Sequence, residues 1–171
     1  MRTIVVGVGD CKLSIENDCE LVSYALGSCI GVAIWDPKTH VAGLLHLMLP
    51  DSRAHPPADM QTQPYRYADT GLPLLFRRAY ELGADKRRLI VRLAGGASMV
   101  DGNGVFNIGR RNHAAVRRIL WQAGVLIHGE EVGGSISRTV RLDVNTGRFV
   151  IRDPMDEERQ LPATFAGGGL S

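Results

Sequence analysis

The chain has few of the features that assign a protein to a class at once. Its 171 residues include 3 cysteines, 6% aromatic residues and a formal net charge of only +2. An odd number of cysteines without C-x-x-C spacing argues against a disulfide framework and against structural zinc. The small net charge gives no electrostatic reason to expect nucleic acid as a partner. These scarcities favour a protein that keeps its thiols reduced, as in the cytoplasm.

Membrane and motif signals are also missing. No apolar run reaches the length of about 18 residues that a membrane span needs, and the N-terminus "MRTIVVGVGD" has no cleavage region of a signal peptide. The sequence contains neither G-x-S-x-G nor H-E-x-x-H. "DGNGVF" (101–106) departs from a calcium loop at its fifth and sixth positions, and "AGGASM" (94–99) lacks the Gly-Lys-Ser/Thr ending of a phosphate loop. We therefore expect tight connections there, and neither a metal ion nor a cofactor.

Short apolar runs bounded by turn residues dominate the sequence. Their richness in β-branched residues predicts strands, and Asn145-Thr146-Gly147 predicts a hairpin turn between the last two. We expect one domain over 1–158 and a disordered tail over 159–171. The predicted strands are 3–9, 20–26, 30–36, 41–49, 87–96, 125–132, 138–144 and 148–153.

Two segments have helical periodicity, at about 70–82 and 110–123. In the first, Asp69 or Thr70 is the expected cap, Gly83 the expected end, and Pro73 is tolerable only in the first turn. Residues 51–67 contain three prolines and are expected to form an exposed loop. The pattern predicts an α/β (α+β) fold, a layered sandwich of mostly antiparallel sheet with two main helices packed on it.

A thiol and an imidazole stand out within the apolar runs "GSCIGVAIWD" and "VAGLLHLMLP". If the chain turns around Pro37 to Thr39, residues whose numbers sum to roughly 75–77 face each other, so Cys29 and His46 are neighbours across a hairpin. A register slip of one residue would place them on opposite faces. Two interpretations stay open: a satisfied structural histidine near an inert cysteine, or a catalytic pair in which imidazole activates the thiol.

A set of short motifs resembles a known family. "LGSC", "DP", "HLMLPDS", "YADT", "AGGASM" and "NIGRRN" occur in this order across residues 26–112. Together they resemble the CheD family of chemoreceptor glutamine deamidases. The paired glycines of "EEVGGSISRTV" also match, although the residues around them depart from the family pattern.

The resemblance implies site residues. The family nucleophile is the Cys of G-S-C and the base is the His of H-x-M-L-P, which correspond to Cys29 and His46. A third catalytic residue, usually Thr, stands six positions before the Cys, where this chain has Ser23. Gly27 is then expected to support the site by allowing a tight bend, and the amides of Ser28 and Cys29 to stabilise the oxyanion.

The resemblance also implies a function and partners. It implies a hydrolase without a cofactor that converts receptor glutamines to glutamates through a thioester, and a fold similar to deamidating-toxin cysteine hydrolases. Its substrates would be methyl-accepting chemotaxis receptors. An alternative is a regulatory binding module for a CheC-type phosphatase, with or without receptor methylesterase activity.

Overall fold

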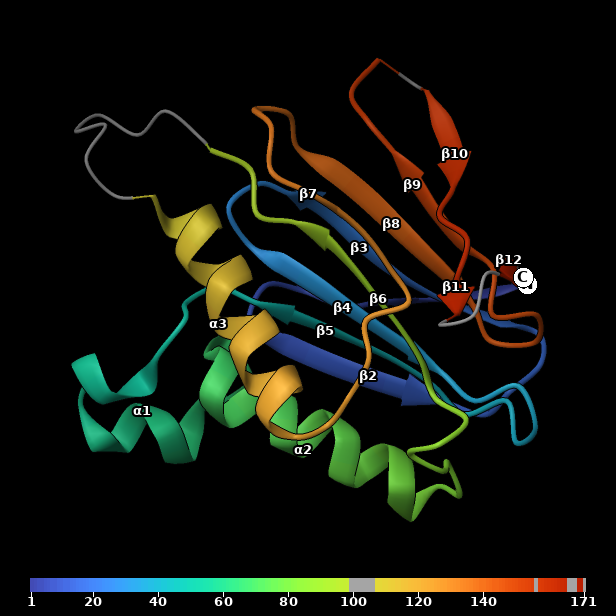
Figure 1. Cartoon of the computed structure of the whole chain (residues 1–171), viewed down its shortest axis with the longest axis horizontal. Coiled ribbons are helices and arrows are strands. Elements are labelled where there is room, and N and C mark those ends of the chain that lie inside the picture. Colours follow the sequence, from blue (N-terminus) through green and yellow to red (C-terminus); the bar gives the residue numbers. More distant parts are fainter. Residues whose placement is uncertain (99–106, 156, 166–168, 171) are drawn as a thin grey trace.

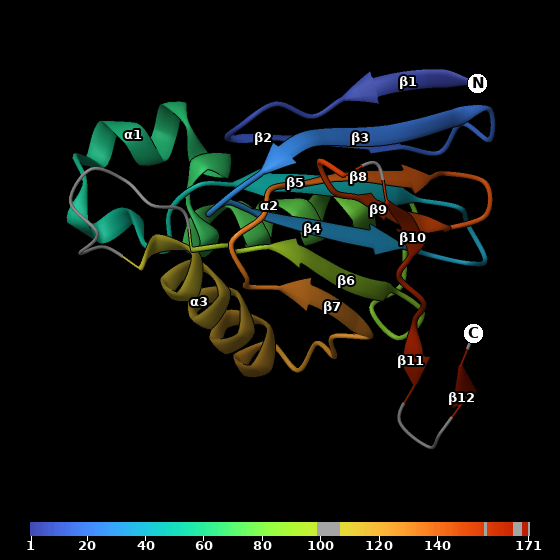
Figure 2. The same ribbon diagram turned by 90° about the horizontal axis from the view of Figure 1, so that it is seen from above.

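The structure is a computed structural model that describes residues 1–98, 107–155, 157–165 and 169–170. Two five-stranded sheets lie face to face, and helices cover the free face of one of them (Figures 1 and 2). We call this covered sheet the central sheet and the other the outer sheet. The predicted α+β layering, with mostly antiparallel strands, is confirmed.

The outer sheet has the strand order β1-β3-β8-β9-β10. β1 runs parallel to β3, and the other neighbours are antiparallel. The hairpin predicted around Asn145 joins β8 to β9. The strands are β1 (Arg2–Val5), β3 (Cys19–Leu26), β8 (Arg138–Asp143), β9 (Phe149–Arg152) and β10 (Glu158–Gln160).

The central sheet has the order β2-β5-β4-β6-β7, with only β6 and β7 parallel. The first predicted strand, 3–9, is wrong in its second half, because the chain turns at Val8 and Gly9 and starts a separate edge strand. The left-handed φ of 72° at Gly9 permits that turn. The strands are β2 (Asp10–Ser14), β5 (Ala42–Leu47), β4 (Ile30–Trp35), β6 (Ile90–Gly95) and β7 (Gly129–Val132).

The two main helices, α2 (Ala68–Glu81) and α3 (Ile108–Gln122), pack against each other and on the central sheet. The predicted caps of α2 are wrong: Tyr67 is the N-cap, and the Asp69 carboxylate accepts hydrogen bonds from Ser52 instead. Because the helix starts earlier than predicted, Pro73 lies beyond its first turn. The helix ends where predicted, at Gly83, whose φ is 108°.

Two apolar cores follow from these layers. The core between helices and central sheet takes its sheet side chains from Ile30, Val32, Leu45 and their neighbours. The core between the two sheets takes the opposite faces of the same strands, such as Ala33 and Leu44, together with residues of β3, β8 and β9. Strand β4 is therefore buried on both faces, which explains why its sequence is apolar without alternation.

Most of residues 51–67 are exposed or half-buried, as predicted, but they do not form an irregular loop. They contain α1 (Pro57–Thr62) and the 3₁₀ turns η1 (Ser52–Ala54) and η2 (Pro64–Arg66), which tertiary hydrogen bonds hold near α2.

The segment after β9 also makes ordered contacts. β10 pairs with β9, and the amides of Leu161 and Thr164 donate to the carbonyls of Phe149 and His128. Part of the predicted disordered tail is thus held against the sheets. It also includes β11 (Thr164–Phe165) and β12 (Gly169–Leu170).

Buried Asp36 organises the turn between β4 and β5. Its carboxylate accepts hydrogen bonds from the amides of Lys38, Thr39 and Asp85, and it pairs with the Arg88 guanidinium at 2.8 Å. Burial by itself would raise the pKa of the Asp36 carboxyl, but Arg88 and the amides outweigh burial and hold the pKa well below its usual range. This turn fixes the register of the β4–β5 hairpin.

We expect Asp36→Asn to destabilise the fold by about 2 kcal/mol, since hydrogen bonds to a charged group are lost and Arg88 keeps its charge without a partner. Because the folded pKa is depressed, the stability that ionised Asp36 contributes is present above the unfolded pKa of about 3.9 and is lost as pH falls below it. Urea unfolding at pH 7 and pH 3.5 measures both effects. Asp18→Asn is the control, since the Asp18 side chain is 89% exposed, and an equal effect of the two substitutions would contradict this role.

Candidate active site

The hairpin register places Cys29 and His46 on one face of the central sheet. Gly31 pairs with His46, so the paired numbers sum to 77, within the predicted range. Cys29 lies two residues before Gly31 and packs against the core between the sheets, the side to which Leu44 also points. The two side chains are diagonal neighbours on that face, and Gly31 has no side chain to separate them.

The three cysteines have different surroundings. Cys11 and Cys19 are buried, and burial raises the pKa of the Cys11 thiol to about 12. Cys29 is only partly buried. Burial raises the pKa of its thiol as well, while its own backbone amide, close to the sulfur, acts in the opposite direction. Cys29 is therefore the most exposed thiol of the three, and its own backbone amide lies close to its sulfur.

His46 has an unusual environment for a buried histidine. The residue is 2% exposed, and neither ring nitrogen makes a hydrogen bond of normal geometry within the described part of the chain. Burial lowers the pKa of the imidazole, and the nearby Val6 carbonyl opposes this in part. Burying a polar ring without hydrogen-bond partners costs free energy of folding, so its presence needs an explanation, and a catalytic role is one.

The other four histidines have visible structural contacts. His128 accepts a hydrogen bond from the Val91 amide, and His113 pairs with Glu130 at 2.6 Å. His40 contacts Asn17, and the His55 ring lies 5.1 Å from the Tyr67 ring. Within the described part of the chain, His46 differs from these four in being almost fully buried while neither ring nitrogen makes a hydrogen bond of normal geometry. The directions of the two pKa shifts also favour a neutral thiol beside a neutral imidazole at pH 7.

Ser23 lies on β3, fully buried beneath the same region. Its hydroxyl donates a 2.7 Å hydrogen bond to the carbonyl oxygen of Val6, the group that also lies near His46. Because the Ser23 hydroxyl donates its proton to Val6 O, in the connection between β1 and β2, it does not donate directly to His46. The structure connects Ser23 to the imidazole through Val6.

Each of the three carbonyls of the G-S-C segment accepts a hydrogen bond. Gly27 O accepts from the Ala97 amide at 2.9 Å, and Cys29 O accepts from the Gly96 amide at 2.8 Å. The carbonyl between them, Ser28 O, accepts from Asn112 Nδ2 at 2.9 Å. In a trans peptide the N–H points opposite to the C=O. The amides of Ser28 and Cys29 therefore point away from these anchors.

The glycine loop predicted as a tight connection lies directly behind the G-S-C segment, residues 27–29. At Gly95 the φ is 111°, and a Cβ atom would lie 2.2 Å from the carbonyl oxygen of Cys29. Only glycine permits this approach. The loop runs on from β6, which pairs with β4, so it supports the strand that carries Cys29. "DGNGVF", the other Gly-rich segment of the sequence, lies outside the described residues.

The paired glycines of the sequence support this loop in turn. The Gly133 amide donates to Gly95 O, the Ser98 amide donates to Gly134 O, and Arg138 Nη1 also donates to Gly95 O. Both glycines have left-handed φ values, 85° and 72°. Residues 133–138 therefore hold the glycine loop in place, and the glycine loop in turn holds the G-S-C segment.

Asn112 is a residue that the sequence reasoning missed. It is fully buried near the start of α3, and its Nδ2 donates to Ser28 O and to Met48 O, each at 2.9 Å. The sequence contains a signal for Asn112, because this residue lies four and eight residues before Val116 and Leu120, on the apolar face of the helix. A polar side chain on a buried helix face indicates that it has hydrogen-bond partners in the core.

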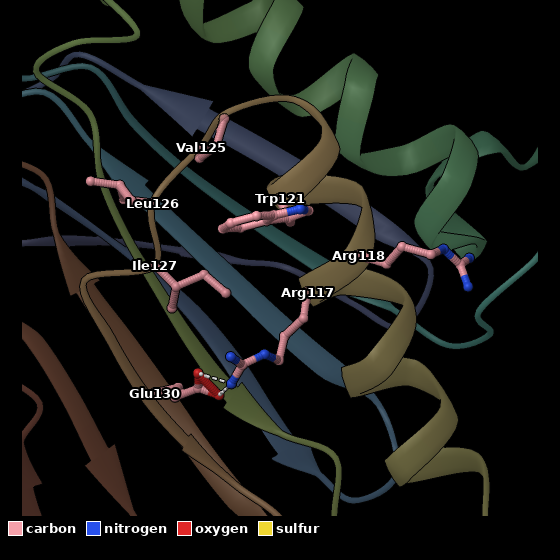
Figure 3. A pocket seen from close by; sticks show the side chains of 7 residues that line it. All are labelled: Arg117, Arg118, Trp121, Val125, Leu126, Ile127 and Glu130. Carbon is pink, nitrogen blue, oxygen red and sulfur yellow. Dashed lines mark hydrogen bonds and ion pairs between the residues drawn. The ribbon is translucent and has the colours of Figure 1, made fainter.

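A surface hollow lies elsewhere, between the outer side of α3 and the segment leading into β7 (Figure 3). Trp121 is 82% exposed beside it. Glu130, at its edge, already pairs with Arg117 and His113. The lining contains no cysteine, serine or threonine, so this hollow offers no nucleophile. Its lining residues are Arg117, Arg118, Trp121, Val125, Leu126, Ile127 and Glu130.

The described residues contain no cluster of three or more His, Cys, Asp or Glu side chains that could hold a metal ion. Among the described helices, none is long and apolar enough to cross a membrane.

Residues 48–153 match the family described as "CheD chemotactic sensory transduction". A protein of Solibacter usitatus, named "Probable chemoreceptor glutamine deamidase CheD", is 48% identical over 169 residues, 99% of each chain. The similarly named "CheD 1" of Syntrophus aciditrophicus is 45% identical over 94% of this chain and its own full length. A relative from Pyrococcus horikoshii is 37% identical over 89% of this chain and 93% of its own. The family match begins just after His46, whereas the Solibacter relative aligns over nearly the whole chain.

Proposed function

The chain belongs to the CheD family, and from that premise we propose that it is a chemoreceptor glutamine deamidase with Cys29 as nucleophile and His46 as base. The name that the relatives carry gives the substrate class. The observation that supports the site most strongly is the register: Gly31 opposite His46 brings the accessible thiol and the unpaired imidazole to one face.

The first half of the proposed reaction transfers the acyl group to sulfur. His46 takes the proton from the Cys29 thiol as the sulfur attacks the carboxamide carbon of a glutamine side chain. The carbonyl oxygen becomes an oxyanion, which the amides of Cys29 and Ser28 stabilise. The imidazolium then protonates the departing nitrogen, the C–N bond breaks, ammonia leaves and a thioester remains.

The second half consumes water. His46 takes a proton from a water molecule as its oxygen attacks the thioester carbon, and the C–S bond breaks. The proton returns to the Cys29 sulfur, and the product is glutamate. The sum is glutamine plus water to glutamate plus ammonia, which requires no cofactor. Hydrolysis of a glutamyl methyl ester would use the same thioester.

The test of this function is mass spectrometry of receptor cytoplasmic fragments after incubation with the protein. We expect the mass increase of an amide replaced by an acid, at particular glutamines, together with release of ammonia. Fragments that remain unchanged across several receptors, with Cys29 still open to alkylation, would overturn the proposed function.

We expect Ser23→Ala to lower kcat about tenfold, since the Val6 carbonyl loses the hydroxyl that fixes it beside His46. Ser23→Thr keeps the donor and restricts χ1, so it should retain activity. The measurement is the deamidation rate, with folding checked by circular dichroism. Ser14→Ala is the matched control, because it removes a buried serine oxygen that accepts from the backbone outside the site. Equal rates for Ser23→Ala and wild type would remove this side chain from the mechanism.

Three finer features belong to the proposal. We propose a cytoplasmic location, a relationship of fold to the deamidating-toxin cysteine hydrolases, and a second role as binding partner of a CheC-type phosphatase. If such a phosphatase binds over the Cys29 face, it should slow alkylation of Cys29 in a concentration-dependent way. Binding that leaves alkylation unchanged would place the partner on another surface.

A further inference from the structure

Asn112 links the two segments that carry the proposed nucleophile and base. One Nδ2 hydrogen bond ends on Ser28 O, in the residue before Cys29, and the other ends on Met48 O, two residues after His46. Because both amide hydrogens point at carbonyl oxygens, the orientation of the side chain is determined. The side chain is fully buried, and its Oδ1 has no hydrogen-bond partner among the described residues.

The hydrogen bond to Ser28 O acts on the peptide that carries the Cys29 amide. Ser28 C=O and Cys29 N–H belong to one planar unit, so holding the carbonyl fixes the direction of the N–H. A donor at the carbonyl also polarises the same peptide and makes its N–H a stronger donor. That N–H lies close to the Cys29 sulfur, where a tetrahedral intermediate would form.

We propose that Asn112 is a positioning residue: through the Ser28 carbonyl it orients and polarises the Cys29 amide as the main oxyanion donor, and through Met48 O it keeps the His46 strand in place. This inference rests on the proposed deamidase function. The neighbouring anchors at Gly27 O and Cys29 O are backbone amides of the glycine loop. Among the described residues, three groups donate to the G-S-C carbonyls, and Asn112 is the one that does so through its side chain.

The test uses the full chain with Asn112→Ala, and Asn107→Ala as control, since Asn107 is exposed just before the same helix. We expect Asn112→Ala to lower kcat for deamidation about 10²-fold, the usual effect of losing an oxyanion donor, with KM changed less than about threefold. Alkylation of Cys29 by iodoacetamide, measured at high pH where the thiol is ionised, should change less than about threefold, since that reaction forms no oxyanion. A variant that merely distorts the site would lose both reactions together.

A spectroscopic measurement is independent of any receptor. In ¹⁵N NMR spectra, Asn112→Ala should move the Cys29 amide signal more than signals elsewhere in the site, because the polarising hydrogen bond is gone. If wild-type protein deamidates nothing but this shift appears, the proposed function fails while the positioning of the amide stands. An unmoved Cys29 signal, or a folded variant with wild-type kcat, would overturn the role of Asn112.

Asn112→Asp covers the case in which the alanine variant does not fold. The aspartate has the same shape, but it can donate to Ser28 O only when protonated, and burial raises its pKa. We expect the ratio of its deamidation rate to that of wild type to rise as pH falls from 8 to 6. A ratio independent of pH in folded protein would contradict the requirement for a donor.

Discussion

Cys29→Ala is expected to abolish deamidation, because no other group at the site can form the thioester. Cys11 and Cys19 are buried at 4% and 0% exposure, and the raised pKa of Cys11 keeps it a neutral thiol. The substitution removes one sulfur atom at a partly open position, so the fold should survive with a loss of less than about 1 kcal/mol. Mass spectrometry of a receptor fragment measures the activity, and thermal unfolding measures the fold.

Cys11→Ala is the matched control, a deletion of the same atom on the edge strand β2 of the same sheet. It should cost stability through the cavity it leaves in the core, with little change in turnover. A Cys29→Ala protein with most of its turnover intact would show that the nucleophile has been misassigned. A wild-type protein that accumulates a thioester adduct at Cys29 with a slow substrate would support the assignment.

His46→Ala is expected to lower kcat by about 10³-fold, since the imidazole acts as base towards the thiol and as acid towards ammonia. The variant leaves a cavity beside Gly31, but the residue makes no hydrogen bond whose loss would unfold the described structure. His128→Ala is the control: it removes the acceptor of the Val91 amide and should reduce stability more than activity.

The pH dependence of Cys29 alkylation tests the contact between the two side chains. The folded thiol has a raised pKa and the folded imidazole a lowered one, so the neutral pair predominates at pH 7. An ordinary thiol has a pKa of about 8.5. Because the pKa of Cys29 is raised, the alkylation rate of the wild-type protein should still increase with pH above that value. His46→Ala should slow alkylation near pH 7, where the imidazole assists proton removal, and match wild type at high pH. Coincident profiles at every pH would mean that the ring does not reach the sulfur.

Much of the sheet structure was predictable because local patterns and tertiary structure agree. The strands that became β4, β8 and β9 are rich in β-branched residues, and those that became β3 and β5 are short, mostly apolar runs. All five have turn residues near their ends. The turn expected around Pro37 to Thr39 predicted that paired residue numbers in β4 and β5 sum to roughly 75–77, and the sum in the structure is 77. The turn position alone did not exclude the one-residue slip that would separate the two faces. Strand β2 was missed because "DCKLS" is short and half polar, as suits an edge strand.

The remainder depended on contacts between distant parts of the chain. The start of α2 was misplaced because Asp69 and Thr70, good local caps, are used by Ser52 and Pro64. The glycine loop and Asn112 anchor the G-S-C carbonyls across separations of 67 to 84 positions, and no local pattern encodes that arrangement. Family resemblance pointed to "NIGRRN" as a motif, but only the fold shows what its last asparagine contacts.

The β4–β5 hairpin also limits how the length of this chain can change. Cys29 and His46 share a face because the paired numbers sum to 77, an odd total that depends on the number of residues in the turn. Inserting or deleting a single residue between Pro37 and His40 would turn His46 towards the helices and Leu45 or Leu47 towards the other sheet, unless a bulge absorbed it. Changes of two residues, one added to each strand, would keep the faces unchanged. Length variation in this hairpin should therefore occur in even steps.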